Sequence, residues 1–248
     1  MTTIVVVVLL PSCGSTAARP TPASTPEAAG AAPRITRPAA QASTAAPEHP
    51  PTRARFVGSI ARIDAPTRRH LLKKNWHPGC PVPLRDLRVV NVSYWGFNGE
   101  VKSGPLVLNE SVAEDVLGVF RTLFRHRFPI KRIALAAKYH PPRPSDYHSH
   151  RDVTASFNCR PVTENPGALS QHSYGWAIDI NPLQNPYVRS DGTVLRRPAL
   201  AYLDRTQDLP GMIHAGDVVV RAFARIGWGW GGDFQTIKDY MHFSLTGT

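Results

Sequence analysis

Two short segments far apart in the chain carry residues that could hold a metal ion. The segment SQHSYGWAIDIN, residues 170–181, contains His172 and Asp179, and the segment KDYMHFSL near the C-terminus contains Asp239 and His242. Histidine nitrogen and carboxylate oxygen both bind Zn²⁺, and a catalytic zinc site uses three protein ligands and keeps a fourth position for water. These residues therefore suggest one hydrolytic metal centre.

The spacing leaves other roles open. A turn at Gly175 could fold His172 back over Asp179, which lies on the apolar stretch WAIDI, where an unpaired carboxylate would be costly. The same residues also fit structural roles, with the histidines hydrogen-bonded in a core and Asp179 paired with an arginine. The residue types alone do not decide between a metal site and such contacts.

Longer motifs around these residues resemble a known family. The pattern SxHxxGxAxD and the segment DYMHF are similar to the zinc-binding signature of the D-alanyl-D-alanine carboxypeptidases (VanY-like, peptidase M15), in their endolysin-like branch. The stretches SFNCR, HSYGWAIDINPLQNPY and GWGWGGDF are similar to a closer subgroup, and the resemblance covers about residues 130–248. The signature is matched here by Ser170, His172, Gly175, Ala177 and Asp179.

The resemblance implies a role for each matched residue. His172, Asp179 and His242 correspond to the ligands of one Zn²⁺ ion. Asp239 corresponds to the general base, which is glutamate in much of the family, and the shorter aspartate lies farther from the water unless the backbone compensates. Arg160 corresponds to the arginine that steadies the substrate carbonyl and its oxyanion, with a structural ion pair as the alternative.

Three further residues are candidates for substrate binding. Ser170 could orient a ligand or bind substrate, or it could simply bond the backbone of its own loop. Tyr174 and Trp230 could line a cleft, and packing is the alternative for both.

The implied function is hydrolysis of peptidoglycan stem peptides by a zinc metallopeptidase. The sequence leaves open a D-Ala-D-Ala carboxypeptidase and an L-Ala-D-Glu endopeptidase. A different class, a non-catalytic wall-binding module that retains the fold, is the alternative.

Hydrophobic patterns predict an α+β domain. We expect a small antiparallel sheet flanked by helices, with the zinc site in a cleft over the sheet, as in the M15/Hedgehog-like peptidase fold that the resemblance implies. A capping box formed by Ser111 and Glu114 is expected to start the first helix, and Asp217 is expected to cap the second, which stops at Gly227. The predicted strands are 88–97, 132–139, 176–180 and 241–245, the helices 109–126 and 218–226, and the long loop 141–169.

The N-terminal region has the composition of an exported, anchored protein. Residues 1–13, MTTIVVVVLLPSC, resemble a signal peptide with a lipobox, in which Cys13 would carry a lipid anchor, although this leader has no Lys or Arg. Residues 14–52 are rich in Ala, Pro, Thr and Ser and read as a disordered tether, and residues 53–248 as the peptidase domain. We therefore expect a membrane-anchored lipoprotein of the cell envelope that faces the wall.

Charge and cysteine content fit that location. The formal net charge of +11 suits an anionic partner such as the cell wall, and no nucleic-acid motif accompanies it. With Cys13 acylated, Cys80 and Cys159 remain as a pair, and export favours a disulfide between them over two free thiols. The chain is expected to act as a monomer.

Overall fold

The computed structural model describes residues 54–137, 151–163 and 165–247. The predicted leader with Cys13, the tether and part of the predicted loop 141–169 lie outside these residues. None of the helices found in the described ranges is long and apolar enough to cross a membrane.

The N-terminal half of the described chain forms a three-stranded antiparallel sheet with strand order β1–β2–β3. Strand β1 (Gly58–Arg62) pairs with β2 (Leu87–Trp95), and β2 pairs with β3 (Val101–Asn109) along its whole length. Helix α1 (Ala65–Lys74) lies between β1 and β2 in sequence and starts where the Asp64 carboxylate accepts a hydrogen bond from the Thr67 N–H. The sequence prediction of a strand at 88–97 is confirmed by β2.

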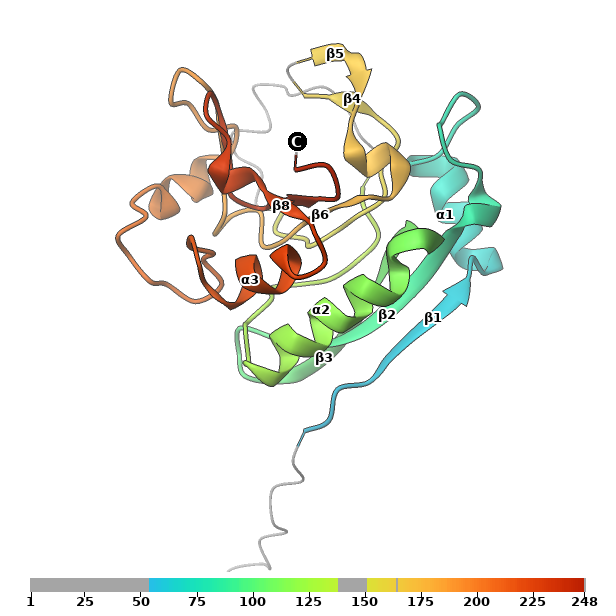
Figure 1. Cartoon of the computed structure of the whole chain (residues 1–248), viewed down its shortest axis with the longest axis horizontal. Coiled ribbons are helices and arrows are strands. Elements are labelled where there is room, and N and C mark those ends of the chain that lie inside the picture. Colours follow the sequence, from blue (N-terminus) through green and yellow to red (C-terminus); the bar gives the residue numbers. More distant parts are fainter. Residues whose placement is uncertain (1–53, 138–150, 164, 248) are drawn as a thin grey trace, which may run out of the picture. The chain divides into compact units, whose positions relative to one another are not determined.

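Helix α2 (Ala113–Arg125) follows β3 and packs against β2 (Figure 1). Its buried face includes Val116, Phe120 and Leu123. The helix prediction is confirmed, but the predicted capping box is wrong. Instead, Asn109 accepts hydrogen bonds from the backbone and hydroxyl of Ser111, so a short 3₁₀ turn (Glu110–Val112) precedes the helix.

The C-terminal half forms a second antiparallel sheet of shorter strands in the order β6–β10–β8. These strands are β6 (Ala177–Asp179), β8 (Gly229–Trp230) and β10 (His242–Ser244). Helix α3 (Val218–Ala224) precedes β8, contacts α2, and is capped as predicted by the Asp217 carboxylate, which accepts from two backbone N–H groups. The strand predictions at 176–180 and 241–245 are confirmed by β6 and β10.

Two predictions for the middle of the chain are wrong. In the described part of the predicted strand 132–139, residues 132–137, only Ile133 pairs. It forms an isolated parallel bridge with Thr154 and no strand. The predicted loop 141–169 contains the hairpin β4 (Pro161–Val162) and β5 (Asn165–Leu169). The remaining elements are β7 (Tyr187–Val188), β9 (Lys238–Asp239) and the 3₁₀ turns Leu84–Asp86, Gln171–Tyr174, Arg197–Tyr202 and Gly231–Asp233.

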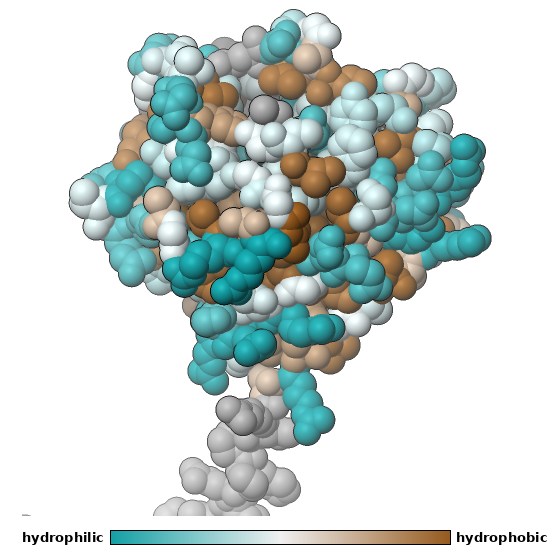
Figure 2. Space-filling view, in the orientation of Figure 1, coloured by the Kyte–Doolittle hydropathy of each residue, from teal (hydrophilic) through white to brown (hydrophobic). Residues whose placement is uncertain are grey.

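The two three-stranded sheets and helices α2 and α3 share one hydrophobic core. It joins Val90 and Leu106 of the first sheet to Phe120 of α2 and to Ile178 and Phe243 of the second sheet. On the face shown in Figure 2, apolar side chains reach the surface only in scattered areas between hydrophilic ones. The short strands β6 and β10, which carry the candidate ligands Asp179 and His242, are therefore backed by buried apolar side chains.

Candidate metal centre and cavity

Strand register and one turn bring the three predicted ligands together. In the antiparallel pairing of β6 with β10, His242 lies directly opposite Asp179. His172 comes from the 3₁₀ turn Gln171–Tyr174, which ends at Gly175 in the left-handed conformation, with φ 71°. His172 Nε2 and His242 Nδ1 each lie 3.2 Å from the same oxygen, Asp179 Oδ1. The predicted reversal at Gly175 is thus confirmed.

A hydrogen bond to a backbone carbonyl places one proton on the ring of His172. Its Nδ1 lies 2.7 Å from the carbonyl oxygen of Ser156, and because a carbonyl can only accept, Nδ1 carries the proton. In the neutral imidazole, Nε2 therefore presents a lone pair toward Asp179. Such an outer contact to a backbone carbonyl commonly orients a metal-binding histidine.

The ionised Asp179 oxygen needs positive charge between it and the two imidazole nitrogens, which protons or one metal ion can supply. Burial alone would raise the pKa of Asp179, but the charges and hydrogen bonds of His172 and His242 outweigh it and hold that pKa well below its usual value. An ionised oxygen facing an imidazole lone pair at 3.2 Å is repelled unless a proton or a metal ion lies between them. One ligand atom from each of the three residues lies within 4.8 Å of the others, so the group fits a single divalent cation.

Asp239 lies beside this group in a different environment. It belongs to β9, which pairs with β7, and it stands three residues before His242. Its Oδ1 atom is buried and has no hydrogen-bond partner within the described part of the chain. Burial raises the pKa of Asp239 to about 7, although the nearby His242 acts in the opposite direction. A carboxyl group with that pKa can both accept and release a proton near neutral pH.

A cavity of about 760 Å³ opens at Asp179 and Asp239. The Asp179 side chain is 24% exposed, whereas the side chains of His172 and His242 are 3% and 9% exposed. The carboxylates therefore face the cavity and the histidines lie behind them. Arg160 and Met241 also line it.

Arg160 is bonded to the turn Gln171–Tyr174 and to its own segment. Its backbone N–H donates to Ser173 Oγ at 2.9 Å, and its guanidinium Nη1 donates to the carbonyl oxygen of Pro161 at 3.0 Å. Its positive charge acts on Asp239 and lowers the pKa of that carboxyl group against the effect of burial. The structure thus brings Arg160 to the cavity that holds the two carboxylates.

The three predicted substrate contacts are placed differently. Ser170 caps the turn Gln171–Tyr174 by accepting from the backbone of His172, and Tyr174 stacks on Trp176 with ring centroids 5.0 Å apart. Trp230 is 6% exposed in the shared core, and its indole N–H donates to the carbonyl oxygen of Tyr240. None of the three is among the described residues that line the cavity. Their positions match the packing and loop-bonding alternatives left open by the sequence.

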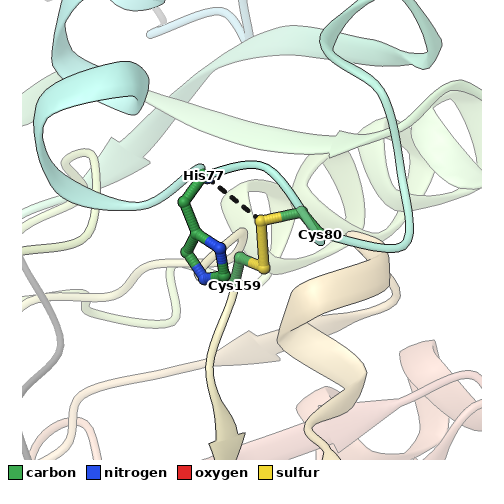
Figure 3. Close-up of side chains that lie close together, drawn as sticks. All are labelled: His77, Cys80 and Cys159. Carbon is green, nitrogen blue, oxygen red and sulfur yellow. Dashed lines mark hydrogen bonds between the residues drawn. A yellow bond between two sulfur atoms is a disulfide. The ribbon is translucent and has the colours of Figure 1, made fainter.

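The predicted disulfide is present between Cys80 and Cys159. Figure 3 shows His77 beside it, with the backbone N–H of His77 bonded to the Cys80 sulfur. These three residues could also surround a metal ion by distance alone. Their sulfur atoms, however, are bonded to each other and are not thiolates, so this group does not compete with the His172, Asp179 and His242 group for zinc.

Several residues of the site were not predicted from the sequence. Ser156 orients His172 through a backbone carbonyl, which leaves no signal in residue type. Arg132, Arg151 and Arg196 line the cavity from segments far apart in the chain. The net positive charge was visible in the composition, but not the convergence of these three arginines on one cavity.

Comparison with known protein families gives one match, over part of the chain. Residues 163–245, which contain the described cluster, match the family model of D-alanyl-D-alanine carboxypeptidase. This match confirms the resemblance to the peptidase M15 family over these residues and indicates a hydrolase. No curated protein and no solved structure gave a significant match.

Proposed function

We propose that this chain is a zinc-dependent peptidase that hydrolyses peptidoglycan stem peptides. The observation that carries the proposal is the contact of two buried imidazoles with one ionised carboxylate oxygen, beside a second carboxylate whose pKa is raised to about 7. The family match supports the peptidase activity, and the His172, Asp179 and His242 group supports the metal.

The residues divide the chemistry between them. A zinc ion held by His172, Asp179 and His242 would lower the pKa of a bound water and polarise the scissile carbonyl. Asp239 accepts a proton from the attacking water and passes it to the leaving amine, a role for which a pKa close to neutral is favourable. Arg160 donates to the carbonyl oxygen as it gains negative charge.

The location of the protein is part of the proposal. A lipid anchor on Cys13, an extended tether and a basic domain would together hold the site near the anionic wall outside the cytoplasmic membrane. The disulfide between Cys80 and Cys159 supports export, because disulfides persist in oxidising compartments. We propose that the domain acts there as a monomer.

Hydrolysis of defined stem peptides tests the activity. Purified protein is incubated with stem peptides, with and without a chelator, and the products are read by mass spectrometry. We expect cleavage that the chelator abolishes and added zinc restores. Cleavage of none of the peptides would favour a wall-binding module that retains the fold.

The Asp239→Ala variant tests the proton transfer. We expect the rate to fall at least about 100-fold, because general acid–base catalysis contributes roughly that much. The zinc content should remain at one equivalent, since Asp239 is not a proposed ligand. A rate equal to that of the unchanged protein would reject Asp239 as the base.

A further inference from the structure

The cavity is more basic than the proposed hydrolysis requires. Five lysine and arginine side chains line it, against the two carboxylates of Asp179 and Asp239. Only one of the five, Arg160, has a role in the proposed reaction. The five are Lys74, Arg132, Arg151, Arg160 and Arg196.

Three of these arginines lie on neighbouring segments. Arg196 Nη1 donates to the carbonyl oxygen of Arg151 at 3.1 Å, which joins the segment before the turn Arg197–Tyr202 to the segment at 151. The carbonyl oxygen of Arg132 accepts from the backbone N–H of Thr154 at 2.8 Å, which joins the segment at 132 to the same stretch. The arginines therefore converge although their sequence positions are far apart.

The stretch that connects them also leads to the metal group. Ala155 pairs with Asp179 in an antiparallel bridge. Arg151 precedes Ala155 by only four residues, so their Cα atoms are at most roughly 14 Å apart. A peptide segment of a few residues spans that distance. A substrate whose scissile bond lies at Asp179 and Asp239 can therefore extend to the arginines.

Electrostatics support the same arrangement. Arg196 acts on Asp239 from the segment after β7, and Arg160 acts on Asp239 from the segment before β4. Arg196 also acts on the buried carboxyl group of Asp152, as does Lys131. A concave site lined mainly by one sign of charge concentrates ligands of the opposite sign.

We propose that Arg132, Arg151 and Arg196 form an anion subsite that binds a carboxylate of the substrate peptide near the bond to be cleaved. This inference rests on the proposed function and narrows its substrate class. Guanidinium groups bind carboxylates through paired, charge-assisted hydrogen bonds. Two sources fit the same chemistry: the C-terminal carboxylate of a stem peptide, and the α-carboxylate of a γ-linked D-glutamate within it.

Three forms of one peptide separate these sources. They are the stem pentapeptide L-Ala-γ-D-Glu-L-Lys-D-Ala-D-Ala, its C-terminal amide, and the form with D-isoglutamine in place of D-glutamate. Dissociation constants are measured by calorimetry with the zinc-loaded full chain carrying Asp239→Ala, so that turnover does not disturb binding. We expect one of the two amidations to weaken binding about 10-fold or more, as for a hydrogen bond to a charged group. The amide that binds less tightly identifies the carboxylate.

Substitutions then assign the loss to the arginines. Arg196→Gln should weaken binding of the unmodified pentapeptide about 10-fold. The same substitution should leave nearly unchanged the dissociation constant of the amide form that already binds less tightly. Because Arg196 also anchors its segment to Arg151, the exposed residue Arg132 provides a second variant, Arg132→Gln, with the same expected direction. Arg197→Gln is the matched control, because Arg197 is exposed, adjacent in sequence and not part of the described cavity lining. Thermal unfolding verifies that each variant is folded.

Each outcome decides the inference. The subsite is overturned if all three peptides bind equally. It is also overturned if Arg196→Gln and Arg132→Gln weaken binding of the acid and amide forms by the same factor. Cleavage by the unchanged protein without discrimination between the peptides overturns the subsite and leaves the peptidase intact. Discrimination in binding without zinc-dependent cleavage supports the subsite and contradicts the peptidase. If none of the peptides binds, the subsite is overturned.

Discussion

Asp179 and Asp239 show how environment separates two carboxylates that line the same cavity. Asp179 contacts two histidines, which hold its pKa well below the usual value in spite of burial. Asp239 has a buried oxygen without a partner in the described structure, and burial raises its pKa to about 7. A pair of groups with pKa values pushed apart in this way commonly divides into a permanently ionised group and a proton-transferring one.

The proposed role of Asp239 as the general base predicts how the rate depends on pH. The pKa of Asp239 is raised above the ordinary value, so its carboxylate form is lost as pH falls through about 7, and a nearby divalent cation moves this loss to lower pH. The measurement is kcat/KM from about pH 5 to 9. We expect kcat/KM to fall as the pH decreases below about 7, or below a lower pH when the cation is bound. In Asp239→Ala the residual kcat/KM should not show this decrease at acid pH. If the variant shows the same decrease at acid pH, another group causes it and not Asp239.

Residues within one local motif were predictable, and residues that converge through the fold were not. His172 and Asp179 share one short segment, and His242 follows Asp239 by three residues. Spacing and resemblance therefore predicted the group that the structure brings together. The contact of His172 with the Ser156 carbonyl depends on backbone position rather than on side-chain type. The convergence of Arg132 and Arg196 depends on pairing between distant segments.

At the scale of elements, the turn at Gly175 sets the position of His172. Gly175 has φ 71°, and a Cβ atom there would lie 2.5 Å from the backbone nitrogen of Asn109. Asn109 in turn donates its backbone N–H to the Gly175 carbonyl oxygen at 3.1 Å. The end of β3 and the turn that carries His172 are therefore in direct backbone contact, and only glycine fits between them.

Substitution of this glycine should destabilise the fold and the metal group together. Gly175→Ala adds a steric clash to the left-handed conformation, and we expect a loss of more than about 2 kcal/mol in the free energy of unfolding. Gly99→Ala is the matched control, because Gly99 has φ 74° with open space around its Cβ position, and should lose only about 1 kcal/mol. Chemical denaturation measures both. Equal losses would show that the close approach to Asn109 is unimportant.

The elements were predicted unevenly for identifiable reasons. Helix α2 and strands β2, β6 and β10 have clear apolar patterns, and Asp217 is a typical N-cap. The stretch after 132 is apolar enough for a strand, but in its described part only Ile133 forms a bridge. The capping box at Ser111 failed because Asn109 bonds to the Ser111 backbone and hydroxyl first. Local pattern identifies a segment's preference, and its neighbours decide whether the preference is realised.

At the scale of the whole molecule, the disulfide links the segment after α1 to the segment that carries Arg160. Cys80 and Cys159 are separated by 79 positions, and Cys159 immediately precedes Arg160. The backbone N–H of Cys159 also donates to the carbonyl oxygen of Asn75 at 2.9 Å. The bond therefore connects the N-terminal half of the described chain to one wall of the cavity.

Removal of this bond should lower global stability. For a loop of this length we expect the Cys80→Ser/Cys159→Ser variant to lose about 4 kcal/mol in the free energy of unfolding, because the unfolded chain regains the freedom of an open loop. Chemical denaturation measures the loss, and reduction of the unchanged protein should reproduce it. Equal stability of the oxidised and reduced forms would show that the bond does not constrain the unfolded chain.

X-ray absorption spectroscopy of the chain loaded with one equivalent of zinc identifies the atoms that bind the metal. We expect a first shell of nitrogen and oxygen only, at about 2.0–2.2 Å, with the outer-shell signature of two imidazoles. In His242→Ala one imidazole should be lost, and zinc binding should weaken. A sulfur shell at about 2.3 Å, or failure to take up zinc, would contradict the assignment of His172, Asp179 and His242 as the metal site.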